Sequence, residues 1–99
     1  MPDTESSVRV ILNRDELRYE LWSGDRLDGF AAFRERPGAI DIFHTLIEPE
    51  LEGHGLGGRQ VAGVLDDARA RGLMVVPTCS FVASYVSRNP GYADLLVAG

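Results

Sequence analysis

A cluster of glycines, GHGLGG, constrains the fold of this chain more than any other stretch of its sequence. It holds Gly53, Gly55, Gly57 and Gly58 and lies directly before a segment with helical periodicity. Glycine weakens regular structure, so this density indicates a sharp backbone bend or the close approach of another group. Unpaired N–H groups at a helix N-terminus also favour an anion. The cluster therefore predicts a phosphate-binding turn, and the alternative left open is that the glycines only shape the turn.

Two familiar phosphate-binding motifs fit the letters of this cluster but not its surroundings. Gly53 to Gly58 matches G-x-G-x-x-G, yet that fingerprint belongs after the first strand of a doubly wound sheet, with a ribose-binding acid about 20 residues on. Here strand patterns already fill the first half of the chain, and Val75 stands where the acid is needed. A P-loop requires lysine and a hydroxyl residue after its last glycine, whereas this chain has Arg59 and Gln60. Neither motif is predicted.

Alternating apolar and polar residues dominate the first half of the chain, which is the pattern of β-strands. Proline and glycine at Pro37-Gly38 and the stretch SGDR supply turn residues between them. The predicted strands follow one another as an antiparallel meander, and they span about 8–12, 17–21, 29–36 and 39–47.

The spacing of the apolar residues changes after the glycine cluster. Residues 56–71 repeat apolar side chains at helical spacing, with Gln60 on the polar face and Gly72 as the stop. A short buried strand, 73–76, and a second helix after Pro77 complete the pattern. A strand, a helix and a strand in succession predict one parallel βαβ crossover. The expected fold class is α/β (α+β), with the meander, one crossover and a C-terminal helix.

Composition describes one small soluble domain. The chain has 99 residues, of which 44% are hydrophobic and 25% charged, and we expect 8–99 to form the domain and the polar segment 1–7 to be a disordered tail. No apolar run approaches the ~18 residues of a membrane span, and no secretory signal is visible, so a cytoplasmic location is expected.

The net charge and the residue types limit which binding partners are expected. A net charge of −5 argues against binding to nucleic acid or to an anionic membrane, and it favours a cationic partner such as an amine. One cysteine and two histidines give a metal site little to build on, so no metal is expected. The oligomeric state is not indicated by the sequence.

The sequence also resembles a known family. Residues 47–57, IEPELEGHGLG, are similar to the acetyl-CoA signature V-x-P-x-[LY]-[RQ]-G-x-G-[IL]-[GA] of the GNAT superfamily of N-acetyltransferases. Four further segments resemble the short YjdJ-type branch of that superfamily, and they are HT at 44–45, VVPTC at 75–79, FVASYV at 81–86 and NPGYADLLV at 89–97. The resemblance implies a minimal GNAT-like fold that binds acetyl-CoA (coenzyme A) and transfers acetyl to an amine of a small molecule or protein.

The resemblance further implies which residues hold the cofactor. The CoA pyrophosphate would lie on the glycine loop, and the pantetheine arm would run in a split between 39–47 and 73–76. The implied cofactor-binding residues are Ile47, Gly53, His54, Gly55, Leu56, Gly57, Gly58 and Asn89. Glu52 departs from the signature, which has Arg or Gln at that position. A carboxylate beside two phosphates predicts weaker binding.

Two side chains are the leading candidates for the chemistry. Acetyl transfer needs a deprotonated acceptor, a polarised thioester carbonyl and a proton for the departing thiolate. Tyr85 matches the superfamily tyrosine that protonates the CoA thiolate, and the alternative is a core aromatic. Cys79 is expected at a strand end before a helix, and the resemblance implies that it accepts the acetyl group or forms a disulfide with CoA. The alternative for Cys79 is a small buried hydrophobe.

His44 is a third catalytic candidate. The alternating pattern places it on the strand face shared by Ile40, Ile42 and Leu46. It is interpreted either as a general base or as a core or cleft-edge histidine. Two non-catalytic hypotheses also stay open: a CoA-binding accessory module without an acceptor pocket, and an interaction domain on a GNAT scaffold with no affinity for CoA.

Overall fold

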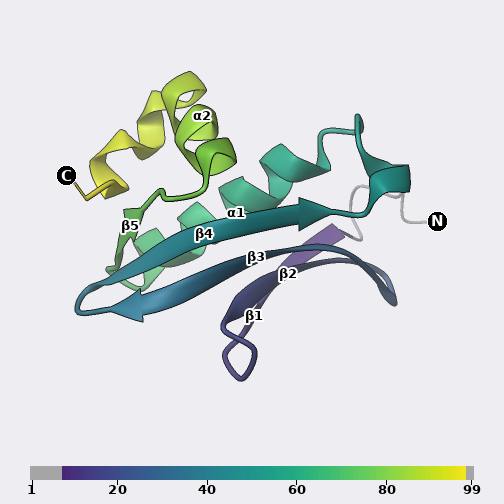
Figure 1. The fold of residues 1–99 in the computed structure, drawn as a ribbon, viewed down its shortest axis with the longest axis horizontal. Helices are drawn as coiled ribbons and strands as arrows, with labels where there is room; N and C mark the ends of the chain where they lie inside the picture. The colour runs from purple at the N-terminus through teal and green to yellow at the C-terminus, as the bar shows by residue number, and fades with distance from the viewer. Residues whose placement is uncertain (1–7, 98–99) are drawn as a thin grey trace.

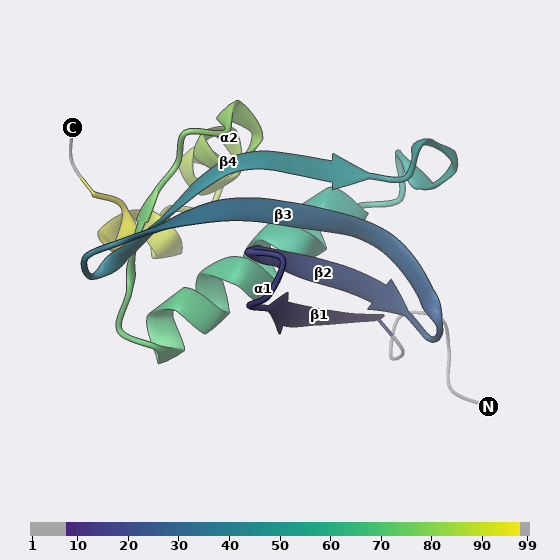
Figure 2. The same cartoon turned by 60° about the horizontal axis from the view of Figure 1, so that its bottom comes forward.

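The computed structural model of the chain describes residues 8–97, so the predicted tail 1–7 and the last two residues of the predicted domain lie outside the described part. Its centre is a five-stranded sheet in the order β1-β2-β3-β4-β5 (Figures 1 and 2). The strands are β1 (Val8–Asn13), β2 (Arg18–Ser23), β3 (Arg26–Arg36), β4 (Ala39–Ile47) and β5 (Met74–Val76). The first four pair antiparallel and β5 pairs parallel to β4, which confirms the predicted meander and crossover.

The long helix α1 packs across the sheet, and the C-terminal helices follow β5 (Figures 1 and 2). The elements are the 3₁₀ helix η2 (Pro49–Leu51), α1 (Leu56–Ala70), α2 (Ser80–Arg88) and the 3₁₀ helix η3 (Pro90–Leu95). Within residues 8–97 no helix is both long and apolar enough to cross a membrane. The α+β fold class predicted from the sequence is confirmed.

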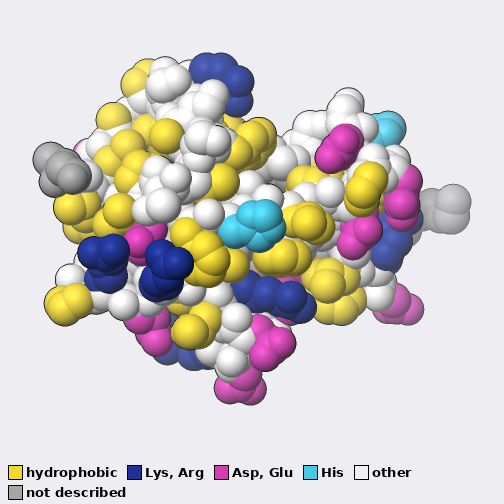
Figure 3. Space-filling model, in the orientation of Figure 1, with side chains coloured by type: hydrophobic (Ala, Val, Ile, Leu, Met, Phe, Trp, Pro, Cys, Tyr) yellow, Lys and Arg dark blue, Asp and Glu magenta, His cyan; other side chains and the backbone are white. Residues whose placement is uncertain are grey.

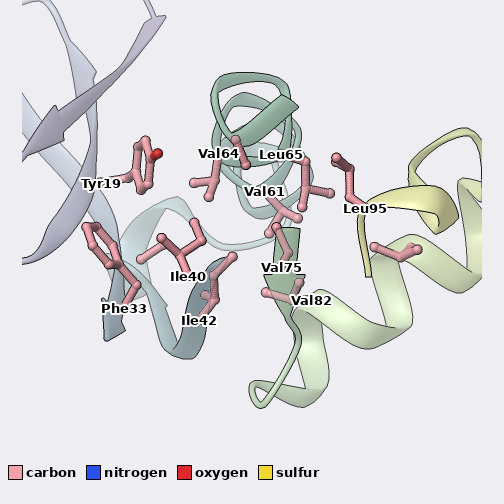
Figure 4. Close-up of a cluster of buried hydrophobic side chains, with 13 residues drawn as sticks. Tyr19, Phe33, Ile40, Ile42, Val61, Val64, Leu65, Val75, Val82 and Leu95 are labelled. Carbon is pink, nitrogen blue, oxygen red and sulfur yellow. The ribbon is translucent and has the colours of Figure 1, made fainter. Parts of the chain in front are cut away.

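The core lies between the sheet and α1 and continues to α2 and η3 (Figure 4). Both α-helices contribute the apolar stripe that their periodicity predicts. Its members include Tyr19, Phe33, Ile40, Ile42 and Val75 from the sheet, Val61, Val64 and Leu65 from α1, Val82 from α2 and Leu95 from η3. Burying each of these side chains stabilises the fold by about 1.5–3 kcal/mol before entropy is counted.

A bulge in β4 corrects the prediction for His44. Ala32 pairs with His44 but the next residue, Phe33, pairs with Ile42, so Phe43 is an extra residue in β4. One extra residue reverses the alternation of side chains beyond it. His44 is therefore exposed on the face opposite to buried Ile42, and only its predicted neighbour Leu46 shares that face with it. Alternation in the sequence gave no sign of the bulge.

The edge of β4 opens where β5 ends. The two strands pair only from Ala39 to Asp41, opposite Met74 to Val76. One more backbone bond follows, from the Cys79 N–H to the Ile42 carbonyl at 2.8 Å. Beyond it, residues 43–47 of β4 have no strand partner on this side within the described chain. The sheet is thus split, and the free backbone edge of β4 faces the N-terminus of α1.

Candidate functional site

A cleft of about 480 Å³ lies at this split. Its walls are the end of β4 from Thr45 to Ile47, the loop after η2, the first turn of α1 and the ring of Phe81 from α2. The same hollow is visible in the space-filling view between the part of the molecule that contains α2 and the part that contains η2 (Figures 1 and 3). The cleft therefore joins a free strand edge to a helix N-terminus.

Each of the four glycines in the loop has its own structural requirement. Gly53 and Gly55 adopt φ of 86° and 76°, which side chains of L-residues rarely allow. Gly57 and Gly58 lie in the first turn of α1, where a Cβ would come within 2.9 Å of the Phe81 ring and 3.3 Å of the Tyr85 ring, respectively. Two glycines thus shape the turn, and two let α2 pack closely on α1.

The helix terminus that these glycines form presents free donors to the cleft. The first helical bond in α1 runs from Arg59 N–H to the Gly55 carbonyl at 3.2 Å, so the amides of Leu56, Gly57 and Gly58 have no acceptor within the helix. Gly55 at the N-cap supplies no side-chain cap, and the first turn carries no acidic residue. Free amides and the positive end of the dipole together suit an anion such as phosphate.

The predicted cofactor residues meet at this cleft with two exceptions. Ile47, Gly53 and the stretch 55–58 all line it, and so does exposed Glu52. His54 instead lines a neighbouring pocket of about 290 Å³ with Arg26 and Arg59. Asn89 caps α2, and its side-chain amide donates to the Tyr85 carbonyl at 2.8 Å. A cofactor role for these residues stays a prediction.

Cys79 lies beside the cleft at the N-cap of α2. Its Sγ is 3.5 Å from the hydroxyl of Thr45, a residue that lines the cleft. Partial burial raises the pKa of the Cys79 thiol, but hydrogen bonds with Thr45 and with the amides of Phe81 and Val82 outweigh it and bring the pKa below its usual value. The thiolate is the nucleophilic form of cysteine, so this environment favours reactivity.

The other two catalytic candidates lie away from the cleft walls. The Tyr85 ring packs on Gly58 at the first turn of α1, and its centroid is 6.2 Å from that of Tyr92. The His44 ring lies on the outer face of the sheet, 5.7 Å from the ring of Phe30. The structure therefore brings Cys79 to the cleft, packs Tyr85 on the first turn of α1, and places His44 on the opposite face of the sheet from Ile42.

Gln60 is a cleft residue that the sequence pattern misplaced on the polar face of the helix. It is fully buried, lines the cleft, and donates from Nε2 to the Phe30 carbonyl at 2.9 Å. Its Oε1 has no hydrogen-bond partner among the described residues. Space for this amide exists because Gly29, on the strand below, has no side chain. In the sequence, only the proximity of Gln60 to the glycine cluster indicated that this residue could lie in the cleft.

The geometry of the cleft and the sheet first indicates the class of protein. A mixed sheet that splits at a parallel strand pair, with a glycine-rich helix terminus facing the split, is the arrangement of an N-acetyltransferase fold. Comparison with known proteins then gives the family: residues 18–95 match the family model of the GCN5-related N-acetyltransferases, and the chain belongs to this family. No group of three or more His, Cys, Asp or Glu residues in the described chain could hold a metal ion.

A solved structure supports the fold. The solution structure of a GCN5-like protein from Staphylococcus aureus superposes with a TM-score of 0.70 over 95% of this chain and 92% of that chain, at 22% sequence identity. At this identity the likeness supports the fold alone. None of the curated proteins matches the sequence.

Proposed function

We propose that this protein binds acetyl-CoA in the cleft and transfers its acetyl group to an amine. The observation that carries the proposal is the continuity between the free amides of α1 and the free edge of β4. The amides suit a pyrophosphate, and a free strand edge suits an extended arm that carries its own amide groups. Bound acetyl-CoA would supply a thioester that is activated for acyl transfer.

Different residues of this chain would then have different roles in the acetyl transfer. On the open edge of β4 the Thr45 amide hydrogen-bonds to the Cys79 thiol, and the backbone N–H groups beyond it would polarise a carbonyl without any side chain. Cys79 is the proposed nucleophile, since its partner Thr45 lines the cleft. Tyr85 remains the proposed proton donor, because its ring packs on Gly58, a residue that lines the cleft. The amine acceptor, the YjdJ-type likeness and the cytoplasmic location stay proposals.

Calorimetry with CoA tests the proposal most directly. We expect CoA to bind the parent protein saturably and acetyl-CoA to compete with it. If neither CoA nor acetyl-CoA binds, the proposal is removed. Turnover of acetyl-CoA over a panel of amines, with polyamines and lysine peptides included, then separates an enzyme from a non-catalytic CoA-binding module. Binding without turnover on any amine would favour the module.

The covalent route through Cys79 has its own test. In that route the thiolate attacks the thioester carbonyl, the CoA thiolate leaves, and the acetyl group is held on Sγ until an amine takes it. Incubation with acetyl-CoA should add one acetyl mass to the parent protein and none to Cys79→Ala. An unmodified parent protein would leave direct transfer as the only route.

Glu52 should weaken the cofactor site. Glu52 lines the cleft beside the loop, so Glu52→Gln removes a negative charge close to the proposed phosphate site. Exposed charge pairs are worth about 0.2–1 kcal/mol, and CoA affinity should therefore rise up to about fivefold at low salt. Glu50→Gln is the matched control, because Glu50 is an exposed carboxylate that does not line the cleft. An equal gain in both variants would point to net charge alone.

A further inference from the structure

A polar link joins the two chain segments at the point where β4 and β5 part. The carboxylate of Asp41 is only 2% exposed. The Thr78 hydroxyl donates to its Oδ1 at 2.5 Å, and Arg36 donates to its Oδ2 at 3.0 Å. The guanidinium of Arg34 lies 3.9 Å from the same oxygen. A buried carboxylate is thus fully engaged by one hydroxyl and two arginines.

Of the three contacts to Asp41, only the hydrogen bond from Thr78 comes from the chain segment that follows β5. Arg34 and Arg36 come from β3, whereas Thr78 comes from the segment that leads from β5 into α2. The bond to Thr78 is the main cause that holds the pKa of Asp41 below its usual range, against the opposing effect of burial and with help from Arg36. Hydrogen bonds to an ionised acceptor are shorter and stronger than neutral ones, so this contact fixes Thr78 firmly.

Thr78 is followed directly by the candidate nucleophile. The Cys79 N–H donates to the Ile42 carbonyl at 2.8 Å, so adjacent residues bind adjacent positions of β4. One of these bonds is made by a side chain and the other by the backbone. Together they set the position of Cys79 relative to β4, and with it the 3.5 Å contact between Sγ and the Thr45 hydroxyl.

We propose that Asp41 and Thr78 are positioning residues that clamp the segment 77–79 onto β4 and thereby hold the Cys79 thiol against Thr45. The contact with Thr45 stabilises the thiolate, so a loosened clamp makes the thiol a weaker acid and a slower nucleophile. The catalytic consequence rests on the proposed function. The effect on the thiol does not, because it depends only on the residues of this chain.

The test compares two substitutions at one position. Thr78→Val removes the hydroxyl but keeps the branched shape, whereas Thr78→Ser keeps the hydroxyl. The readout is the rate of alkylation by iodoacetamide from about pH 6 to 10, which reports the thiol pKa because Cys79 is the single cysteine. We expect Thr78→Val to lower the rate at neutral pH by roughly three- to tenfold, with a higher apparent pKa, and Thr78→Ser to restore the parent profile.

A control separates this effect from general loss of stability. Asp94→Asn breaks an exposed ion pair with Arg69 that links η3 to α1, away from the clamp, and should leave the thiol profile unchanged. If circular dichroism shows that Thr78→Val does not fold, Asp41→Ala gives the same readout, because it removes the acceptor that the Thr78 hydroxyl binds. An unchanged profile in a folded Thr78→Val or Asp41→Ala variant would overturn the proposal, and so would an equal change in Thr78→Ser.

Calorimetry with CoA on the same variants keeps the two proposals apart. The clamp lies towards the start of β4 and the glycine loop follows its end, so Thr78→Val should keep CoA affinity within about twofold while turnover falls with thiol reactivity. A parent protein that does not bind CoA would remove the proposed function, and the alkylation profile would still test the clamp by itself. A large loss of CoA affinity in Thr78→Val would overturn the clamp as proposed, because the link would then shape the cofactor cleft instead of the thiol.

Discussion

Gly57→Asp should weaken CoA binding by at least about a hundredfold. Gly57 lies in the first turn of α1 and lines the cleft, so the substitution places a carboxylate among the free amides that are proposed to hold the pyrophosphate. Two like charges about 4 Å apart repel by roughly 4 kcal/mol at the effective dielectric near a protein surface. Screening and side-chain rotation reduce that figure, but about 2.7 kcal/mol is enough for two orders of magnitude. Calorimetry with CoA at low and high salt measures the loss.

Gly57→Ala is the matched control for this result. A Cβ at position 57 would lie 2.9 Å from the tip of the Phe81 ring, so both variants introduce this contact with α2 and only the aspartate adds a charge. The Phe81 side chain is 39% exposed and can swing aside, and the alanine variant should therefore lose only a few-fold in affinity. Equal losses in the two variants would mean that crowding, not charge, governs the site, and the phosphate assignment would fail.

Gly29→Ala should lower the free energy of unfolding by about 3 kcal/mol, which is the largest effect expected from one added methyl group here. A Cβ at this position would lie 2.3 Å from the Leu46 carbonyl oxygen and 2.8 Å from Cδ1 of Ile47. The first contact is with backbone that is held in the β3–β4 pairing, so it cannot be relieved by a rotamer change. Urea denaturation followed by circular dichroism measures the shift.

The end of β4 also forms a wall of the cleft, so the folded fraction of Gly29→Ala should bind CoA poorly. Gly91→Ala provides the comparison, because a Cβ there meets nothing within 4 Å and the backbone has no positive φ. It should be neutral or slightly stabilising. A Gly29→Ala variant as stable as Gly91→Ala would show that β3 and β4 can separate at this point without loss of the fold.

Local patterns predict most of the regular elements. The fourth predicted strand, 39–47, has the bounds of β4, and the helix after the glycines begins at Leu56 as expected. The third strand begins at Arg26, before the predicted Gly29, because the register of β2 and β3 shifts there and lets the pairing continue. The sequence pattern treats Gly29 as a boundary, whereas the structure uses it for close packing against β4.

The fold class, the glycine-rich turn and the grouping of most cofactor candidates follow from the amino-acid sequence without the structure, because periodicity and glycine content act over a few neighbouring residues. The sequence did not determine on which side of the molecule each chemical group lies, and only the three-dimensional structure decided it. The bulge at Phe43 turns His44 away from the core face, and the packing of α2 on α1 explains Gly57 and Gly58. The clamp between Asp41 and Thr78 joins residues 37 positions apart. Such contacts depend on strand register and helix packing, which no local pattern encodes.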